Sequence, residues 1–296
     1  MSDRLEIGFK TSPQSVDWAT LDATWQAAGE LDVFDAGWMN DHLTDMSDDQ
    51  GGPSLEAVTT MASLAHHVRG KWLGHAVLSN TFRHPAVLAK QATVLDHISG
   101  GRFILGLGAG WHEFEHRSFG IPLPPIGERI DRLGSALAAI KALFSPAAAH
   151  PPGVSLADPF YPLDRATNEP PPLRPGGPPI WLGGQKPRGI ALAARYADGW
   201  LVPGINAGDV AYFTTKRDEI RAALDAAGRG PAAFVFAAQV NCGTTADQRR
   251  QALDQAIALR RAGAGHVILQ VAPGEGRDGL VAIAREVAEP LREAAG

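Results

Sequence analysis

The sequence contains one cysteine, Cys242, among 296 residues. A single thiol cannot form a disulfide within the chain, which suits a protein of a reducing compartment such as the cytoplasm. The basic surplus of a nucleic-acid-binding protein is missing as well, because 27 lysines and arginines stand against 32 acidic residues, a formal net charge of −5. These two shortages argue against a disulfide-stabilised secreted domain and against a nucleic-acid partner.

Long apolar runs are also absent. No run approaches the ~20 residues that a membrane-spanning helix needs. Residues 1–6 mix charges without an apolar stretch, so we expect no signal peptide. The composition is otherwise globular, with 45% hydrophobic and 20% charged residues. We therefore expect a soluble cytoplasmic protein without a membrane partner.

Short strand-like runs alternate with longer segments of helical spacing. The runs lie at 5–10, 33–40, 72–78, 103–107, 180–182, 200–202, 234–240 and 266–271. Alternation favours a parallel sheet covered by helices, and eight units favour a closed (β/α)8 TIM barrel. We predict one such domain over residues 1–296. Residues 145–179 are rich in proline and glycine without a clear period, which predicts a structureless insertion or lid that covers the pocket.

Chemistry in such a barrel takes place where the strands end. Asp41 and His42 end the second predicted strand. A carboxylate beside an imidazole can position a proton donor or acceptor near neutral pH. The alternative for this pair is a helix cap followed by a surface histidine.

Glycines follow two other predicted strands. Gly106, Gly108 and Gly110 do not complete the dinucleotide fingerprint, because its third glycine would fall on Trp111. They permit close approach of a flat ring or of another backbone segment, or they form a tight loop without a ligand. The segment 183–188 precedes a helix and carries basic side chains, which indicates an anion site, with an ordinary glycine turn as the alternative.

Residues 112–116 match the zinc motif H-E-x-x-H, in which His112 and His116 would bind the metal and Glu113 would activate water. Gly120 and Pro122 would end a helix here after little more than one turn. We therefore predict a polar first helical turn beside the pocket and no resident metal. A zinc hydrolase remains an alternative of a different class.

Several motifs together resemble the bacterial luciferase-like monooxygenase superfamily. They are the segments 81–85, 99–102, 106–111 and 127–129, in this order and spacing. Asp41-His42, with the segments 179–184 and 197–200, looks most similar to the actinobacterial branch that uses the deazaflavin coenzyme F420. The resemblance covers the whole chain and is weakest over 145–179.

The resemblance implies a barrel, commonly dimeric, in which the cofactor ring lies against a bulged third strand with a non-prolyl cis peptide bond. By alignment that bond joins Ala76 to Val77. His42 matches the proposed proton donor of these relatives. The positions that match cofactor contacts are Asp41, Ser79, Ala109 and Gly110, with Gly183, Gly184 and Lys186 at the phosphate and tail.

One departure limits the transfer of function. The sugar-phosphate dehydrogenases among these relatives carry a catalytic glutamate directly after the glycine at position 110, where this chain has Trp111. Their substrate is therefore not expected here, and Trp111 would form a hydrophobic wall that favours a less polar one. Glu113 or Glu115 would be the nearby sources of a carboxylate.

These observations predict an oxidoreductase that transfers a hydride between bound F420 and a small organic substrate, with His42 handling the proton. The alternatives are a monooxygenase of the same fold that uses flavin mononucleotide (FMN), the zinc hydrolase, and a catalytically silent cofactor carrier. We expect a homodimer.

Overall fold

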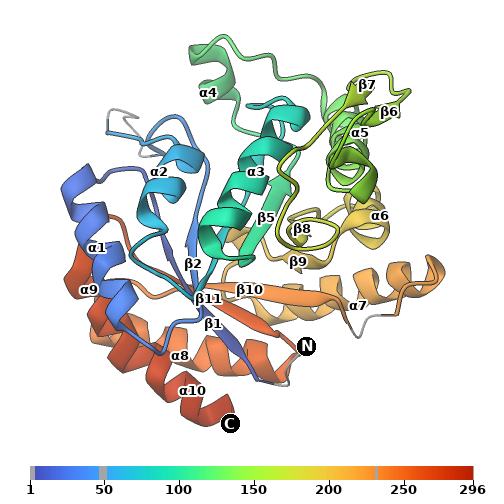
Figure 1. Cartoon of the computed structure of the whole chain (residues 1–296). Helices are drawn as coiled ribbons and strands as arrows, with labels where there is room; N and C mark the ends of the chain where they lie inside the picture. The colour runs from blue at the N-terminus through green and yellow to red at the C-terminus, as the bar shows by residue number, and fades with distance from the viewer. Residues whose placement is uncertain (1–3, 47–51, 231–232, 296) are drawn as a thin grey trace.

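The computed structural model describes residues 4–46, 52–230 and 233–295. Parallel strands form a closed ring around the centre of the molecule (Figure 1). The strands are β1 Glu6–Thr11, β2 Ala36–Met39, β3 Trp72–His75, β4 Leu78–Ser79, β5 Phe103–Gly108, β8 Ile180–Leu182, β9 Gly199–Leu201, β10 Val235–Asn241 and β11 His266–Gln270. Pairing of β3 with β5 closes the sheet, and β3 and β4 together occupy one of eight places. The predicted TIM barrel is confirmed.

Helices cover the outside of the barrel (Figure 1). They are α1 Trp18–Glu30, α2 Ala57–Leu64, α3 Pro85–Ser99, α5 Ile126–Leu143, α6 Pro187–Tyr196, α7 Val210–Ala226, α8 Ala246–Arg261, α9 Gly276–Ile283 and α10 Glu289–Ala295, with the short α4 Glu113–Ser118 above the ring. A π-helical turn, η4 Ala284–Ala288, joins the last two. Outward strand residues such as Ile7 and Phe9 pack against these helices as a continuous core.

A carboxylate caps the start of α2. The helix begins at Ala57, and the carboxylate of Glu56 caps it by accepting from the N–H groups of Val58 and Thr59. Ser54, three residues before the helix, donates to the carbonyl of His42 at 2.9 Å. The carboxylate thus satisfies free N–H groups of the first turn.

The lower half of the barrel interior is filled by aromatic side chains. Trp38 and Trp181 stack with ring centroids 5.1 Å apart, and His266 accepts from the indole nitrogen of Trp38. A Cβ on Gly8 would lie 2.7 Å from the Trp38 ring, and one on Gly74 would lie 2.4 Å away, so the two glycines make room for the indole. Any ligand cavity must therefore lie above this layer, at the carboxyl ends of the strands.

The third strand is interrupted at the predicted place. The peptide bond between Ala76 and Val77 is cis, and it separates β3 from β4. Both residues are half-buried. A Cβ on Gly108 of the neighbouring β5 would lie 2.9 Å from the side chain of Val77, so the glycine admits the bulge. The prediction of a cis bond at this position is confirmed.

The segment 145–179 is not structureless. It contains a short 3-10 helix, η1 Pro146–Ala148, and an antiparallel hairpin of β6 Val154–Leu156 and β7 Leu163–Ala166. Asn168 donates to Thr93 of α3, and Arg132 of α5 lies over the ring of Phe160, so the segment packs on the outside of these two helices. Its tip reaches the rim where Tyr161 meets His84. The described contacts hold it against these helices as far as that rim, and its cover over the pocket stays a prediction.

Across the described residues, none of the helices combines the length and apolar character needed to cross a bilayer. Residues 1–3, on which the expectation about a signal peptide partly rests, lie outside the described part of the chain.

Candidate active site

The strand ends bring polar side chains and glycines together at one mouth of the barrel. In parallel pairs, residues in register point to the same side of the sheet. Gly106 is in register with Trp181 and is level with it, and an added Cβ there would meet the carbonyl oxygen of His75. Gly183, two residues after Trp181, faces the interior one layer above the tryptophans. An added Cβ on Gly183 would meet nothing closer than 3.9 Å, so the wall has room for a methyl group here. The opposite wall carries polar side chains from β1 and β10.

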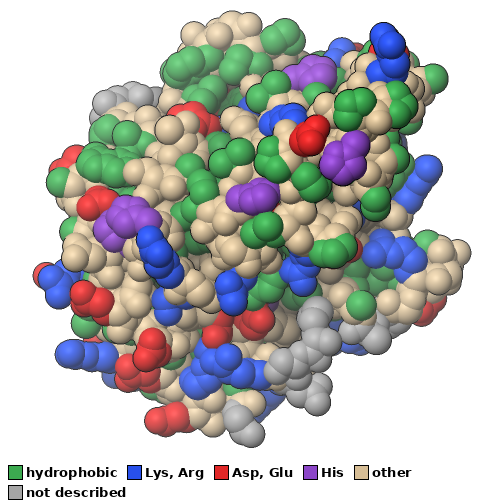
Figure 2. All heavy atoms as spheres, in the orientation of Figure 1, with side chains coloured by type: hydrophobic (Ala, Val, Ile, Leu, Met, Phe, Trp, Pro, Cys, Tyr) green, Lys and Arg blue, Asp and Glu red, His purple; other side chains and the backbone are tan. Residues whose placement is uncertain are grey.

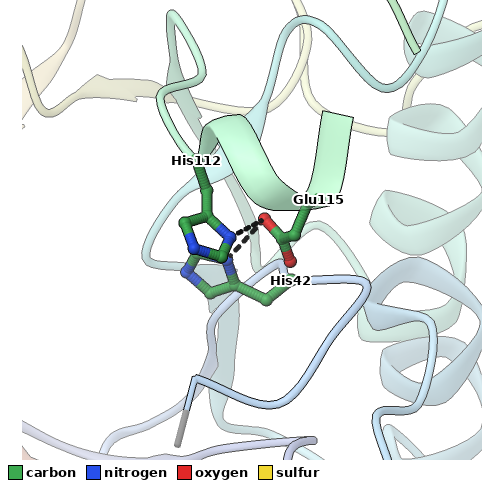
Figure 3. A group of neighbouring side chains, drawn as sticks. All are labelled: His42, His112 and Glu115. Atoms are coloured by element: carbon green, nitrogen blue, oxygen red, sulfur yellow. Dashed lines mark hydrogen bonds and ion pairs between the residues drawn. The ribbon is translucent and has the colours of Figure 1, made fainter. Parts of the chain in front are cut away.

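His42 lies on the loop after β2, and its imidazole is held by Glu115 of α4 (Figure 3). The Nδ1 atom of His42 is 3.0 Å from Oε2 of Glu115, and Nδ1 of His112 is 3.2 Å from the same oxygen. The other oxygen of Glu115 accepts from the backbone N–H groups of Leu43 and Thr44 at 2.6 and 3.1 Å. One buried carboxylate thus fixes the loop and faces two imidazoles.

This geometry determines which nitrogen of His42 is available. Because Nδ1 faces a carboxylate, it carries the proton and donates it, which leaves Nε2 for proton exchange. Within the described residues Nε2 has no hydrogen-bond partner. The ring of Trp111 stands edge-on to His42, with centroids 5.9 Å apart and 62% of Trp111 exposed. Trp111 forms an apolar wall beside the imidazole, as its position suggested.

Glu115 is ionised at neutral pH. Burial alone raises the pKa of its carboxyl, but the hydrogen bond and charge of His42 and the N–H groups of Thr44 and Leu43 outweigh burial and hold the pKa below its ordinary value. A fixed negative charge therefore lies against the imidazole of His42. The carboxylate fixes the orientation of the ring through its contact with Nδ1.

Asp41 anchors the loop between β2 and the interrupted third strand. Its oxygens accept hydrogen bonds from both terminal nitrogens of Arg83, at 2.7 and 2.9 Å, and from the backbone N–H of Ser79 at 2.8 Å. Arg83 also contacts Glu56, the cap of α2. Asp41 thus joins the ends of two neighbouring strands. Its predicted contact with a cofactor stays a prediction.

The H-E-x-x-H ligand set does not assemble. Both ring nitrogens of His116 are engaged, Nδ1 with the carbonyl of His112 at 2.7 Å and Nε2 with the hydroxyl of Thr81 at 2.7 Å. Glu113 points to solvent. In its place, the group His42, His112 and Glu115 has three potential ligand atoms within 4.8 Å of one another. Two imidazoles and one carboxylate are a donor set that Zn²⁺ or Fe²⁺ accepts.

The loop after β5 is tied down around Gly110. Its φ of +78° is a conformation that glycine adopts readily, and an added Cβ would fall 2.4 Å from the hydroxyl of Thr81. That hydroxyl is hydrogen-bonded to Ser79, and Arg129 donates to the carbonyl of Gly110. Ala109 is half-buried against the core. Ser79, Ala109 and Gly110, predicted separately, thus lie on one joined surface next to the cis bond.

The loop after β8 forms a second surface. Gly184 packs on Gly189 of α6 so closely that an added Cβ would lie 2.9 Å from its backbone. Pro187 begins α6, and Lys186 is the cap residue without a side-chain cap bond. Arg188 donates to Asp131 and to the carbonyl of Gly127. The uncapped helix start and Lys186 fit an anionic group, whereas Arg188 is already paired.

Residues 12–294 match the family model described as luciferase-like monooxygenase. The chain belongs to the luciferase-like monooxygenase family. It is 30% identical over 213 residues to the phthiodiolone/phenolphthiodiolone dimycocerosates ketoreductase of Mycobacterium sp. (strain JLS), covering 69% of this chain and 54% of that protein. It is 28% identical over 226 residues to the F420-dependent hydroxymycolic acid dehydrogenase of Mycobacterium tuberculosis, covering 76% and 59%. The chain thus spans little more than half the length of these relatives.

A solved F420-dependent secondary alcohol dehydrogenase, in complex with an F420–acetone adduct, has the same fold, with a TM-score of 0.80 and 16% identity over 98% of this chain and 99% of that one. The chain thus combines membership of this family with sequence similarity to a ketoreductase and to an F420-dependent dehydrogenase. The family resemblance expected from the motifs is confirmed.

Proposed function

We propose that this luciferase-like protein transfers a hydride between bound coenzyme F420 and a small organic carbonyl compound or its alcohol. The arrangement of His42 on Glu115 carries the proposal, because it places an oriented proton-exchanging nitrogen at the barrel mouth. Two F420-dependent or carbonyl-reducing relatives at about 30% identity support the choice of coenzyme and substrate class. Trp111, in place of a polar side chain, favours the less polar members of that class.

The residues around the mouth fit such a coenzyme. The ring would be contacted by Ala76, Val77, Ser79, Ala109 and Gly110. Asp41 would either contact the ring as well or hold in place the strand ends that contact it. Gly183, Gly184 and Lys186 would hold the phosphate and tail at the uncapped start of α6. When bound, the deazaflavin supplies a carbon that accepts or donates hydride and does not readily activate oxygen.

His42 would move the proton that accompanies the hydride. Reduction of a carbonyl needs one proton at its oxygen, and oxidation of an alcohol releases one there. With Nδ1 committed to Glu115, Nε2 gives or takes that proton. Glu115 acts through His42, and Nδ1 of His112 lies 3.2 Å from the same carboxylate oxygen.

Titration of purified protein with oxidised F420 and, separately, with FMN tests the coenzyme. Quenching of tryptophan fluorescence reports binding, and Trp111 and Trp200 lie close to the two proposed cofactor surfaces. We expect micromolar or tighter binding of F420 and weak binding of FMN. The reverse preference would support an FMN-dependent monooxygenase, with oxygen consumption as the next assay. Binding of neither would overturn the cofactor proposal.

A metal-dependent activity is a second candidate, and the group His42, His112 and Glu115 favours it. Elemental analysis of protein purified without chelator decides between the two. A stoichiometric transition metal, with activity lost on chelation, would replace the proton role of His42 by a ligand role. Full activity of metal-free protein would remove this candidate.

We infer that the protein forms a homodimer through α3. Val87, Val94 and Ile98 are 55%, 55% and 47% exposed and lie on one side of that helix. Figure 2 shows hydrophobic side chains over the region that α3 occupies in Figure 1, with charges of both signs around them. Light scattering on the wild type and on Val94→Glu tests this, because a charge in the contact should yield monomers. A wild-type monomer would contradict it.

A further inference from the structure

Lys10, near the carboxyl end of β1, is a buried cation. Only 6% of the residue is exposed. Its Nζ donates to Oε1 of Gln239 at 2.9 Å, and the amide of Gln239 is oriented by its own bond to the carbonyl of Val202 at 2.6 Å. An ammonium has three N–H donors. The described residues provide this one acceptor and no carboxylate within ion-pair distance.

Such a lysine is unfavourable for the folded protein. Lysine is almost never fully buried without a partner of opposite charge, because removal of an ammonium from water costs several kcal/mol. Burial lowers the pKa of Lys10 to about 8. The interior below is already filled by Trp38 and Trp181, so packing of the barrel does not require a charge here. A bound molecule with an electron-rich atom beside the ammonium would account for a lysine being buried here despite this cost.

Lys10 stands one residue before the carboxyl end of β1. Lys10 is in register with Trp38 on β2 and with Gln270 on β11. Gly8, two residues earlier, faces the interior because its added Cβ would meet the Trp38 ring. Side chains two apart in a strand share a face, so Lys10 points inward, one layer above Gly8. On the other side of the interior, Gly183 has no side chain, and an added Cβ there would meet nothing closer than 3.9 Å.

We propose that Lys10 binds and stabilises negative charge on the molecule in the barrel mouth. The inference rests on the proposed function. Hydride transfer moves one hydrogen nucleus and two electrons, so the acceptor gains one negative charge, while the proton is exchanged at His42. That charge arises on the coenzyme when an alcohol is oxidised, and on the substrate oxygen when a carbonyl is reduced. In both cases an electron-rich heteroatom is the partner of the ammonium.

The test uses Lys10→Met, which keeps an unbranched side chain of similar length and removes the positive charge. Its matched control is Lys71→Met, since Lys71 donates to the carbonyls of Leu31 and Phe34 and holds the fold together. In thermal unfolding without ligand we expect a higher Tm for Lys10→Met and a lower one for Lys71→Met. A lysine with a structural role would lower the Tm when replaced. Lys10→Gln, which can still hydrogen-bond, should behave as Lys10→Met if charge is the cause.

Binding separates the two sources of negative charge. Affinities for F420 and F420H2 are measured for each variant, together with affinity for acetate, an oxyanion probe, in the presence of F420. A partner charge within a few ångströms changes an ionisation by at least about tenfold. If Lys10→Met reduces the preference for F420H2 over F420 at least about tenfold, the negative charge lies on the coenzyme. If it reduces the acetate affinity at least about tenfold, the charge lies on the substrate.

Unchanged preference and unchanged acetate affinity, with a lowered Tm for Lys10→Met, would overturn the proposal. Failure of the proposed function gives a different result, because wild-type protein would then bind neither form of the coenzyme. The acetate arm, run without coenzyme in that case, still tests Lys10.

Discussion

Replacement of Glu115 by glutamine tests the proton machinery most sharply. The carboxylate accepts on both sides, from two backbone N–H groups at one oxygen and from His42 at the other. A carboxamide has only one accepting oxygen. If that oxygen faces Leu43 and Thr44, the amide N–H₂ points at Nδ1 of His42. The imidazole must then accept at Nδ1 and carry its proton on Nε2, which is the wrong tautomer for a base.

The size of the effect follows from this change of tautomer. General acid–base catalysis contributes about 10²–10⁴-fold to a rate. In a serine protease the corresponding Asp→Asn change lowers kcat about 10⁴-fold. Proton exchange is here only one part of a reaction that also transfers a hydride, so we expect an effect at the lower end of this range. The expected loss in kcat is about 10²-fold, which raises the activation free energy by about 2.7 kcal/mol. KM and coenzyme affinity should change little.

The assay is steady-state turnover with F420 absorbance, together with a pH profile of kcat. Glu113→Gln is the matched control, because Glu113 belongs to the same helix and is exposed. Glu113→Gln should behave as the wild type. If Glu115→Gln turned over as fast as Glu113→Gln, orientation of His42 by Glu115 would have no part in catalysis.

Three other substitutions test the scaffold by chemical denaturation. Asp41→Asn should lower the free energy of unfolding by about 3 kcal/mol, because it leaves the guanidinium of Arg83 with Glu56 as its one carboxylate partner. A loss below about 0.5 kcal/mol would contradict the role of Asp41 as an anchor between the two strand ends. Gly184→Ala should cost about 1–3 kcal/mol through contact with the α6 backbone, and an unchanged midpoint would refute that packing. Burial alone raises the pKa of Glu56, but Thr59 and Arg83 outweigh it and lower the pKa from 4.5 to about 2. The stabilisation by this carboxylate is thus complete above pH 4.5 and is lost as pH falls toward 2. Glu56→Ala should therefore lower the free energy of unfolding by about 1 kcal/mol at pH 7 and by much less near pH 2. A difference between wild type and variant that stays constant with pH would contradict this.

Local pattern was enough to predict the barrel. Strands such as 103–108 combine apolar residues with glycine ends, and the helix starts at Pro85 and Pro187 follow from the geometry of proline. The hairpin within 145–179 was missed because its paired strands, Val154–Leu156 and Leu163–Ala166, are three and four residues long. Runs of that length among prolines carry no detectable period.

The candidate site was only partly predictable. Sequence spacing placed His112 and His116 on one helical face, yet tertiary contacts turn His116 toward Thr81 and bring Glu115 to His42 across 73 positions. No local signal distinguishes Glu115 from Glu113. Lys10 did carry a signal, a cation at an inward position of a barrel strand, two residues after Gly8. Its importance appears only when the pairing partners show how few acceptors surround it.

Transfer of deuterium from F420H2 labelled at C5 tests the central claim most directly. The wild-type enzyme is mixed with the labelled coenzyme and a panel of apolar ketones, and the alcohol products are analysed by mass spectrometry. The account predicts deuterium on the carbinol carbon of an accepted ketone, with the hydroxyl proton coming from solvent. Release of the label to water, or oxygen consumption without ketone reduction, would contradict it.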